Sequence, residues 1–199
     1  MAEERLILVD ERNRAVGVGE KTAVHRAGLL HRAFSIFIVD DAGRILLQRR
    51  SRQKYHSGGL LANSCCGHPR PGETTQLAAR RRLTEELGIE APLTFGFFSR
   101  YRAELNGGMQ ENEFVYVYFG PLTAQPDPDP AEVSEVEFAS TDEIVRRIAR
   151  QPDGYVYWLR HYFDIHGSQI ARLAKRTART AVTSAAARPR KREAAAARR

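Results

Sequence analysis

Residues 63–69 read Asn-Ser-Cys-Cys-Gly-His-Pro, and the helix-forming segment that follows ends with Arg-Arg-Leu-Thr-Glu-Glu-Leu-Gly-Ile at residues 81–89. Apolar residues recur at helical spacing between residues 74 and 87, and Gly88 is a typical C-terminal helix signal. The first stretch holds the only two cysteines of the chain beside a histidine, and the second is rich in carboxylates and guanidinium groups. Thiols, imidazoles and carboxylates transfer protons and bind metals, so the two stretches predict a chemical site rather than a packed core.

Strand-like segments surround these two stretches. Runs of aliphatic, aromatic and β-branched residues predict strands at residues 5–10, 33–40, 44–49, 95–101, 114–119 and 133–139. Helices are expected at residues 74–87, with Leu77, Ala78, Leu83 and Leu87 on the apolar face, and at residues 142–150 and 158–175. Strands interleaved with a few helices, without an internal repeat, indicate a mixed α/β (α+β) domain. A chain of 199 residues is long enough for one substantial core, and we expect a single domain at residues 1–175.

The net charge is concentrated at the C-terminal end. The formal charge is +7, and residues 176–199 hold eight Arg or Lys residues and one Glu, so residues 1–175 are formally neutral. The segment 176–199 has almost no large apolar side chain to bury, and we expect a disordered basic tail. A merely solvated extension is the favoured interpretation of this tail, with weak attraction to polyanions as the alternative, and the neutral domain argues against specific nucleic-acid recognition.

The cysteines and the hydropathy bear on the location of the protein. Adjacent Cys65 and Cys66 would strain the short ring of a shared disulfide, and no other cysteine is present, so no disulfide is expected. The N-terminus lacks a basic start followed by an apolar run, and no stretch is long enough to span a membrane. We therefore expect a soluble cytoplasmic protein without a membrane contact, and the sequence leaves the oligomeric state open.

The spacing between residues 67 and 89 resembles the Nudix box. The chain matches the box at every position but one. The matching positions are Gly67, Glu73 after five residues, Arg81 after seven more, and the segment that ends Glu-Glu-Leu-Gly-Ile. Arg82 stands at the position where the box has a glutamate. The ordinary Nudix reaction hydrolyses a diphosphate with metal ions held by several carboxylates, so this change disfavours hydrolysis. The resemblance implies a Nudix-type mixed β-sheet core flanked by helices.

The altered box, residues 63–69 and the Gln-Glu-Asn-Glu of residues 110–113 together resemble the type I isopentenyl-diphosphate isomerases, from about residue 3 to about residue 170. The implied reaction converts isopentenyl diphosphate to dimethylallyl diphosphate. It protonates the terminal alkene carbon, passes through a tertiary carbocation and removes a proton on the other side. Cys66 and Glu113 are the implied proton-transfer groups. We assign Glu113, beside Tyr101, as the acid and Cys66 as the base, although the sequence alone leaves that order open, and we expect Cys65 to be packed in the core.

The same resemblance implies two metal sites and a diphosphate site. One ion, Mn²⁺, Mg²⁺ or Zn²⁺, is assigned to His25, His31, His68, Glu111 and Glu113. A second ion, Mg²⁺, is expected to bridge Glu86 and the substrate diphosphate. The implied diphosphate-binding residues are Lys21, Arg50, Lys54 and Arg82, and the alternative for each is a surface cation. Trp158 is implied to stabilise the carbocation, with a role as a core anchor as the alternative.

Three histidines are left outside the implied site, and two alternative functions stay open. His56, His161 and His166 are expected to be structural, and the segment 56–60 departs from the family, which often has Trp and Pro there. A Nudix hydrolase that cleaves a nucleotide diphosphate is the alternative enzyme. A nucleic-acid-associated protein that uses residues 176–199 is the alternative from another class.

Overall fold

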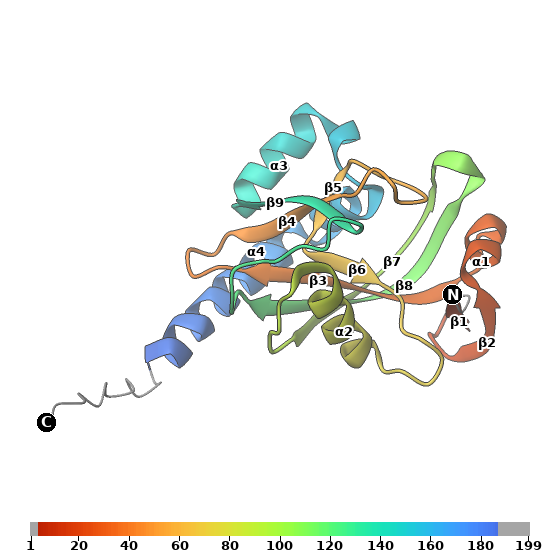
Figure 1. Cartoon of the computed structure of the whole chain (residues 1–199), viewed down its shortest axis with the longest axis horizontal. Coiled ribbons are helices and arrows are strands. Elements are labelled where there is room, and N and C mark those ends of the chain that lie inside the picture. Colours follow the sequence, from red (N-terminus) through yellow and green to blue (C-terminus); the bar gives the residue numbers. More distant parts are fainter. Residues whose placement is uncertain (1–3, 187–199) are drawn as a thin grey trace, which may run out of the picture.

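The computed structural model describes residues 4–186, with side chains through residue 180, as a nine-stranded sheet with helices on its faces (Figure 1). The strands are β1 (Arg5–Val9), β2 (Ala15–Glu20), β3 (His31–Val39), β4 (Ile45–Arg50), β5 (Leu61–Asn63), β6 (Cys65–Gly67), β7 (Thr94–Glu104), β8 (Gln110–Pro121) and β9 (Val133–Ala139). The helices are α1 (Lys21–Ala27), α2 (Thr75–Leu87), α3 (Thr141–Arg150) and α4 (Tyr157–Ala186), with short 3₁₀ turns at Asn106–Gly108 and Pro152–Gly154. The expected mixed α/β class is confirmed.

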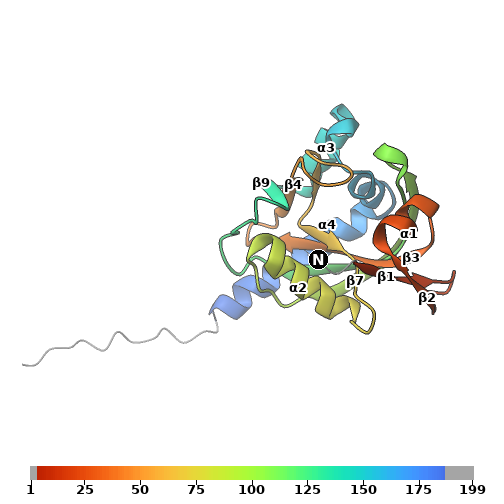
Figure 2. The same ribbon diagram turned by 45° about the vertical axis from the view of Figure 1, so that its right-hand side comes forward.

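Strand β3 connects most of the sheet. It pairs antiparallel with β1, β4 and β6, and it runs parallel to β8 from His31 opposite Glu113 to Val39 opposite Pro121. Strand β8 also pairs antiparallel with β7, and β4 pairs with β5 and β9. Figure 2 shows α1, β1 and β2 gathered at one end of the sheet, with the C-terminal end of α4 at the other.

The side chains of β3 alternate between two cores. Phe34, Ile36 and Ile38 pack in the core that includes α2, whereas Phe37 and Val39 pack in the core that includes α4. Successive side chains of a strand point to opposite faces, so a central strand covered on both sides is almost continuously apolar. This explains why residues 33–39 have no polar side chain except that of Ser35.

Helix α2 begins and ends as the sequence indicates. The Thr74 hydroxyl accepts a hydrogen bond from the Leu77 backbone amide, and Gly88 ends the helix in the left-handed conformation with φ of 64°. Leu83 and Leu87 are fully buried, as expected, but Leu77 is 58% exposed. The prediction for Leu77 was wrong because it lies in the first turn, on the side of α2 that faces away from the sheet.

Helix α4 continues beyond the boundary expected at residue 175. Residues 176–186 are helical, and Ala178 is buried in the core that includes Phe97 and Phe119. The expected tail therefore begins too early, because the small Ala178 is buried in the core although this segment lacks the large apolar residues used to judge burial from sequence. The rest of the expected tail, residues 187–199, lies outside the described residues.

The sequence did not predict α1, β2, β5 or β6. These elements are only three to seven residues long, and tertiary pairing decides such short segments more than local propensity does. Among the described residues, no helix has the length and apolar character needed to cross a membrane.

Replacing Leu83 by Ala should lower the free energy of unfolding by about 2–5 kcal/mol, because a fully buried leucine is removed and a cavity remains. The matched control is Leu77→Ala on the exposed side of the same helix, which should change stability by less than about 1 kcal/mol. Urea unfolding of the two variants measures the difference. Equal losses would contradict the packing of α2.

Candidate active site

Three histidines and two glutamates meet at one end of β3 and β8. His31 begins β3, and the parallel register places it opposite Glu113 of β8. Glu111 lies two residues earlier on β8, so its side chain is on the same face of the sheet. His25 comes from α1, and His68 directly follows β6, which pairs with β3.

The ligand atoms of this group lie close enough to share one cation. Those of His25, His31, His68 and Glu111 are all within 4.8 Å of one another. The Oε2 atom of Glu111 is 3.2 Å from His25 Nε2 and 3.8 Å from His31 Nε2, and Glu113 Oε1 is 3.6 Å from His31 Nε2. The predicted ligands therefore converge.

Hydrogen bonds to the backbone determine which nitrogen of the His25 and His31 rings faces Glu111. His25 Nδ1 is 2.7 Å from the Lys21 carbonyl oxygen, and His31 Nδ1 is 2.8 Å from the Leu29 carbonyl oxygen. Because a carbonyl can only accept, both Nδ1 atoms carry a hydrogen, and in the neutral form of each ring the Nε2 atom presents a lone pair. These Nε2 atoms and Glu111 Oε2 are buried without a hydrogen-bond partner. Such a donor set fits a divalent metal ion.

The charges in this group favour anionic glutamates. Burial opposes ionisation, but the neighbouring His25 and His56 rings hold the pKa of Glu111 well below its usual range. Burial and the charge of Glu111 likewise oppose ionisation of Glu113, yet contacts with His31 and His68 lower its pKa. Burial lowers the pKa of His68 to about 4, so this ring is neutral near pH 7 and able to ligate a metal.

Cys65 and Cys66 point to opposite sides of β6. Cys65 is fully buried beside α2, as expected for a core residue. The Cys66 thiol donates a hydrogen bond to Asn63 Oδ1 over 3.2 Å and lies 3.2 Å from the Ser35 hydroxyl, which is itself 2.9 Å from the Tyr162 hydroxyl. Burial raises the pKa of Cys66 to about 12, so its resting form is the thiol.

Glu113 is held from two directions. The Tyr101 hydroxyl donates to Glu113 Oε2 over 2.5 Å, and His68 Nε2 is 2.9 Å from Glu113 Oε1. The antiparallel register of β7 and β8 places Tyr101 opposite Glu113, which explains the first contact. With the pKa of Cys66 raised and that of Glu113 lowered, the proton of this pair lies on Cys66.

One cavity with about 680 Å³ of empty space, its open mouth included, joins these groups to the basic residues. The predicted site residues that line it are Lys21, Arg50, Lys54, Cys66, His68, Arg82, Glu86, Tyr101, Glu111, Glu113 and Trp158. His25 and His31 are fully buried and adjoin the cavity through Glu111. The structure thus brings together every residue that the sequence assigned to the site.

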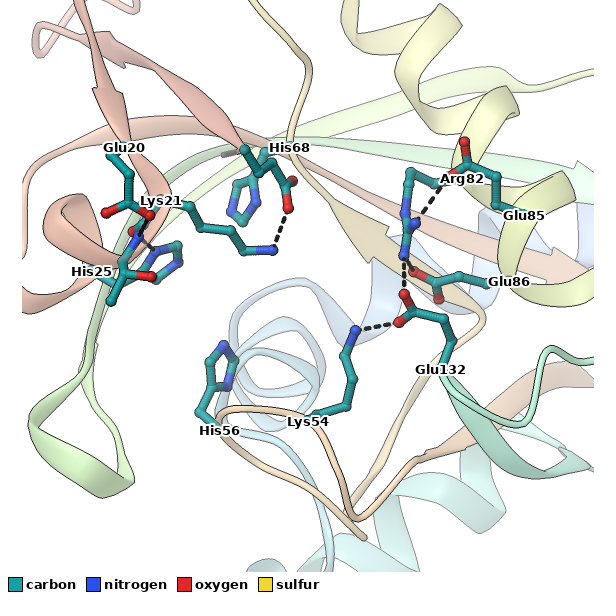
Figure 3. Close-up of polar contacts among 12 residues, drawn as sticks. Glu20, Lys21, His25, Lys54, His56, His68, Arg82, Glu85, Glu86 and Glu132 are labelled. Carbon is teal, nitrogen blue, oxygen red and sulfur yellow. Dashed lines mark hydrogen bonds and ion pairs between the residues drawn. The ribbon is translucent and has the colours of Figure 1, made fainter. Parts of the chain in front are cut away.

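Most of the basic residues are paired with carboxylates (Figure 3). Lys54 contacts Glu132, and Arg82 contacts Glu85, Glu86 and Glu132, with its Nη2 atom 3.1 Å from Glu132 Oε1. On the other side of the cavity, Lys21 forms an ion pair of 2.7 Å with Glu4. The cations that line the cavity are thereby held in place, and an incoming anion would compete with these carboxylates.

Arg50 and Trp158 form the remaining part of the wall. The guanidinium carbon of Arg50 lies 5.3 Å from the centre of the Trp158 ring, and Arg50 Nε is buried without a partner. Arg50 therefore covers one face of the indole with a positive charge.

The sequence missed several residues of the cavity. His56 was expected to be structural, but its Nε2 atom is 3.3 Å from Glu111 Oε1. Glu4, Glu132 and Ser35 also line the cavity. Ser35 gave one usable signal, as the single polar residue in the apolar run of residues 33–39, whereas the other three lie in segments whose position depends on the fold. His161 and His166 do not line the cavity.

Comparisons with known proteins identify the family of the chain. Residues 29–161 match the family model of the NUDIX domain. The chain is 43% identical over 162 residues to Isopentenyl-diphosphate Delta-isomerase 2 of Aromatoleum aromaticum, covering 81% of this chain and 86% of the relative. An Isopentenyl-diphosphate Delta-isomerase of Serratia proteamaculans is 43% identical over 87% of this chain and 97% of its own length.

Solved structures show the same fold. A Deinococcus radiodurans protein, DR0079, superposes with a TM-score of 0.66 and 24% identity, covering 87% of this chain and 99% of its own. The MutT protein of Methanosarcina mazei gives a TM-score of 0.58 and 19% identity, covering 73% of this chain and 96% of its own. The expected Nudix-type sheet is therefore confirmed.

Replacing His68 by Gln should make the metal-free protein less sensitive to acid. The pKa of His68 falls from its ordinary 6.5 to about 4 on folding, so between these pH values the unfolded chain binds the extra proton. Stability from this group is present above pH 6.5 and is lost as the pH falls, by roughly 2 kcal/mol at pH 5. Urea unfolding of chelator-treated wild type and variant at pH 7.5 and pH 5 measures the two losses. A loss in the variant as large as that in the wild type would contradict the burial of a neutral imidazole.

Proposed function

The chain belongs to the Nudix family and, within it, to the isopentenyl-diphosphate isomerases, and on this basis we propose that it converts isopentenyl diphosphate to dimethylallyl diphosphate. The observation that carries the proposal is that Cys66 and Glu113 line one cavity with a His/Glu cluster and with cationic side chains. The proton-transfer groups, the metal ligands and the diphosphate-binding residues thus face the same enclosed space.

The reaction needs one group that gives a proton and one that takes a proton. Protonation of the terminal alkene carbon forms a tertiary carbocation, and loss of a proton from the carbon on its other side gives the product. Cys66 with a raised pKa and Glu113 with a lowered pKa hold one proton between them. Our assignment of Glu113 as the acid requires this proton to move to the carboxyl group, whose orientation the Tyr101 hydroxyl fixes by donating to Oε2 over 2.5 Å.

Two further polar residues support Cys66 in this role. Ser35 and Asn63 each lie 3.2 Å from its sulfur, so the thiol has a fixed position on the cavity wall. A hydrogen bond from the Ser35 hydroxyl favours the thiolate and opposes the effect of burial on the pKa of Cys66, whereas Asn63 Oδ1 accepts from the thiol. Such a site suits a group that gains and loses a proton during turnover.

The His/Glu cluster would hold a divalent ion, Mn²⁺, Mg²⁺ or Zn²⁺, through His25, His31, His68, Glu111 and Glu113. Glu86, which lines the cavity, would bind a second ion, Mg²⁺, together with the diphosphate. When bound, these ions would supply positive charge that offsets the buried carboxylates and the substrate anion.

The diphosphate would lie among Lys21, Arg50, Lys54 and Arg82. Guanidinium and ammonium groups form charge-assisted hydrogen bonds with phosphate oxygens. The buried and unpartnered Nε of Arg50 is a donor that such an oxygen would satisfy. Trp158 at 3% exposure would exclude water from the hydrocarbon part, where a carbocation would otherwise be trapped.

Nudix hydrolysis is less well supported than isomerisation. Arg82 replaces one carboxylate of the box, and its guanidinium group contacts Glu85 and Glu86, two carboxylates of the same box. These ion pairs reduce the negative charge available for a cluster of metal ions on the helix. Two free cysteines support the cytoplasmic location proposed for the enzyme.

The function is tested by incubating chelator-treated protein with isopentenyl diphosphate, with Mn²⁺ and Mg²⁺ added back. We expect conversion to dimethylallyl diphosphate only after the metals are restored, as measured by NMR of the five-carbon chain. Release of phosphate without isomerisation would favour a hydrolase instead. Absence of both products would overturn the proposal.

Cys66→Ala and Glu113→Gln should each lower kcat by about 10²–10⁴, because each removes one proton-transfer group. The matched control is Cys65→Ala, which removes the neighbouring thiol on the opposite side of β6 and should keep kcat within about threefold. Thermal unfolding checks that all three variants are folded. Full activity of Cys66→Ala would remove this thiol from the mechanism and leave the family assignment intact.

A further inference from the structure

The loop between β4 and β5 has an unusual backbone around His56. Ser57 has φ of 52°, a left-handed conformation that is uncommon for residues with a side chain. At Gly58 an added Cβ would lie 2.8 Å from the Arg52 carbonyl oxygen, so the loop closes tightly on itself. Local strain of this kind persists only where the surrounding structure fixes it, and it is concentrated at functional sites.

The His56 ring is bonded at both nitrogens. Its Nε2 atom is 3.3 Å from Glu111 Oε1, and its Nδ1 atom is 3.1 Å from the Ser57 hydroxyl, with the side chain buried. An ionised carboxylate only accepts hydrogen bonds, so Nε2 carries the hydrogen and Nδ1 accepts from Ser57. The Ser57 hydroxyl thus supplies a donor to Nδ1 in the tautomer whose Nε2–H faces Glu111.

The two oxygens of Glu111 face different partners. Oε1 is next to His56, whereas Oε2 faces His25 and His31 and is buried without a hydrogen-bond partner. His56 is not among the four residues whose ligand atoms lie within 4.8 Å of one another. It therefore lies behind the carboxylate rather than in the ligand group.

His56 also contacts the part of the cavity assigned to the substrate. Its backbone carbonyl accepts a hydrogen bond from Arg50 Nη2 over 3.3 Å, and its ring meets Trp158 edge-on with centroids 6.1 Å apart. The side chain and the backbone of one residue thus touch the metal-ligand group and the diphosphate-binding group. A side-chain substitution removes the contact with Glu111 and keeps the contact with Arg50, because the backbone carbonyl stays in place.

We propose that His56 is a positioning residue that holds Glu111 Oε1, so that Oε2 is presented to a divalent cation between His25 and His31. The inference rests on the metal site of the proposed function, although it does not require that the protein be an isomerase. Partners of this kind, which hydrogen-bond to metal-ligating carboxylates, typically change metal affinity by 10–100-fold when they are removed.

The test measures binding of Mn²⁺ alone to the chelator-treated full chain, without substrate, by isothermal titration calorimetry. His56→Leu removes the donor, and we expect the Kd for Mn²⁺ to rise at least tenfold. His56→Gln keeps an N–H donor at the place of Nε2 and should restore the Kd to within about threefold of wild type. His166→Gln, outside the cavity, should leave it unchanged.

Two further measurements exclude a merely structural effect. Thermal unfolding of the metal-free variants verifies that each is folded, and Ser57→Ala tests the same hydrogen-bond chain without changing the ring, with a smaller rise of the Kd expected.

The KM for isopentenyl diphosphate at saturating Mn²⁺ should stay within twofold in His56→Leu, because the His56 carbonyl still binds Arg50. A folded His56→Leu protein with an unchanged Kd, or with a raised KM alone, would overturn the proposal. If His56→Leu binds Mn²⁺ more weakly but the wild-type protein shows no isomerase activity, the role of His56 is supported and the proposed function is refuted.

Discussion

The parallel pairing of β3 with β8 is the interaction on which the site depends. Its register sets His31 opposite Glu113, and the two-residue period of a strand then aligns Glu111 on the same face. A shift by one residue would turn both carboxylates away from the histidines. The same strand β3 carries Ser35, which contacts Cys66, so one alignment positions both the proposed metal ligands and the thiol.

Alternation along single strands separates packing from chemistry. In β3, residues on one face join the core under α2, whereas Ser35 on the other face meets Cys66 and Tyr162. In β6, the same rule directs Cys65 into the core and Cys66 into the cavity. Adjacent cysteines with identical chemistry therefore have different environments, because their side chains point to opposite sides of the sheet.

The cavity balances charge by pairing cations with carboxylates. Arg82 and Lys54 share Glu132, which lies just before β9, and Lys21 pairs with Glu4. Paired and buried charges are better tolerated than isolated ones, so these contacts stabilise cations next to an enclosed site. In the proposed function the substrate diphosphate and its Mg²⁺ would take over part of this balance.

The sequence by itself determined the fold class, the family and the residue types of the site. Local patterns can be recognised from the sequence alone, and they include the Nudix box spacing, the Asn-Ser-Cys-Cys-Gly-His-Pro stretch and the glutamates at 111 and 113. Tertiary structure alone decided that His56 lies behind Glu111, that Glu132 binds Arg82 and Lys54, and that the last helix continues past residue 175. These features depend on loop conformation and on contacts between distant segments, which no local periodicity or propensity encodes.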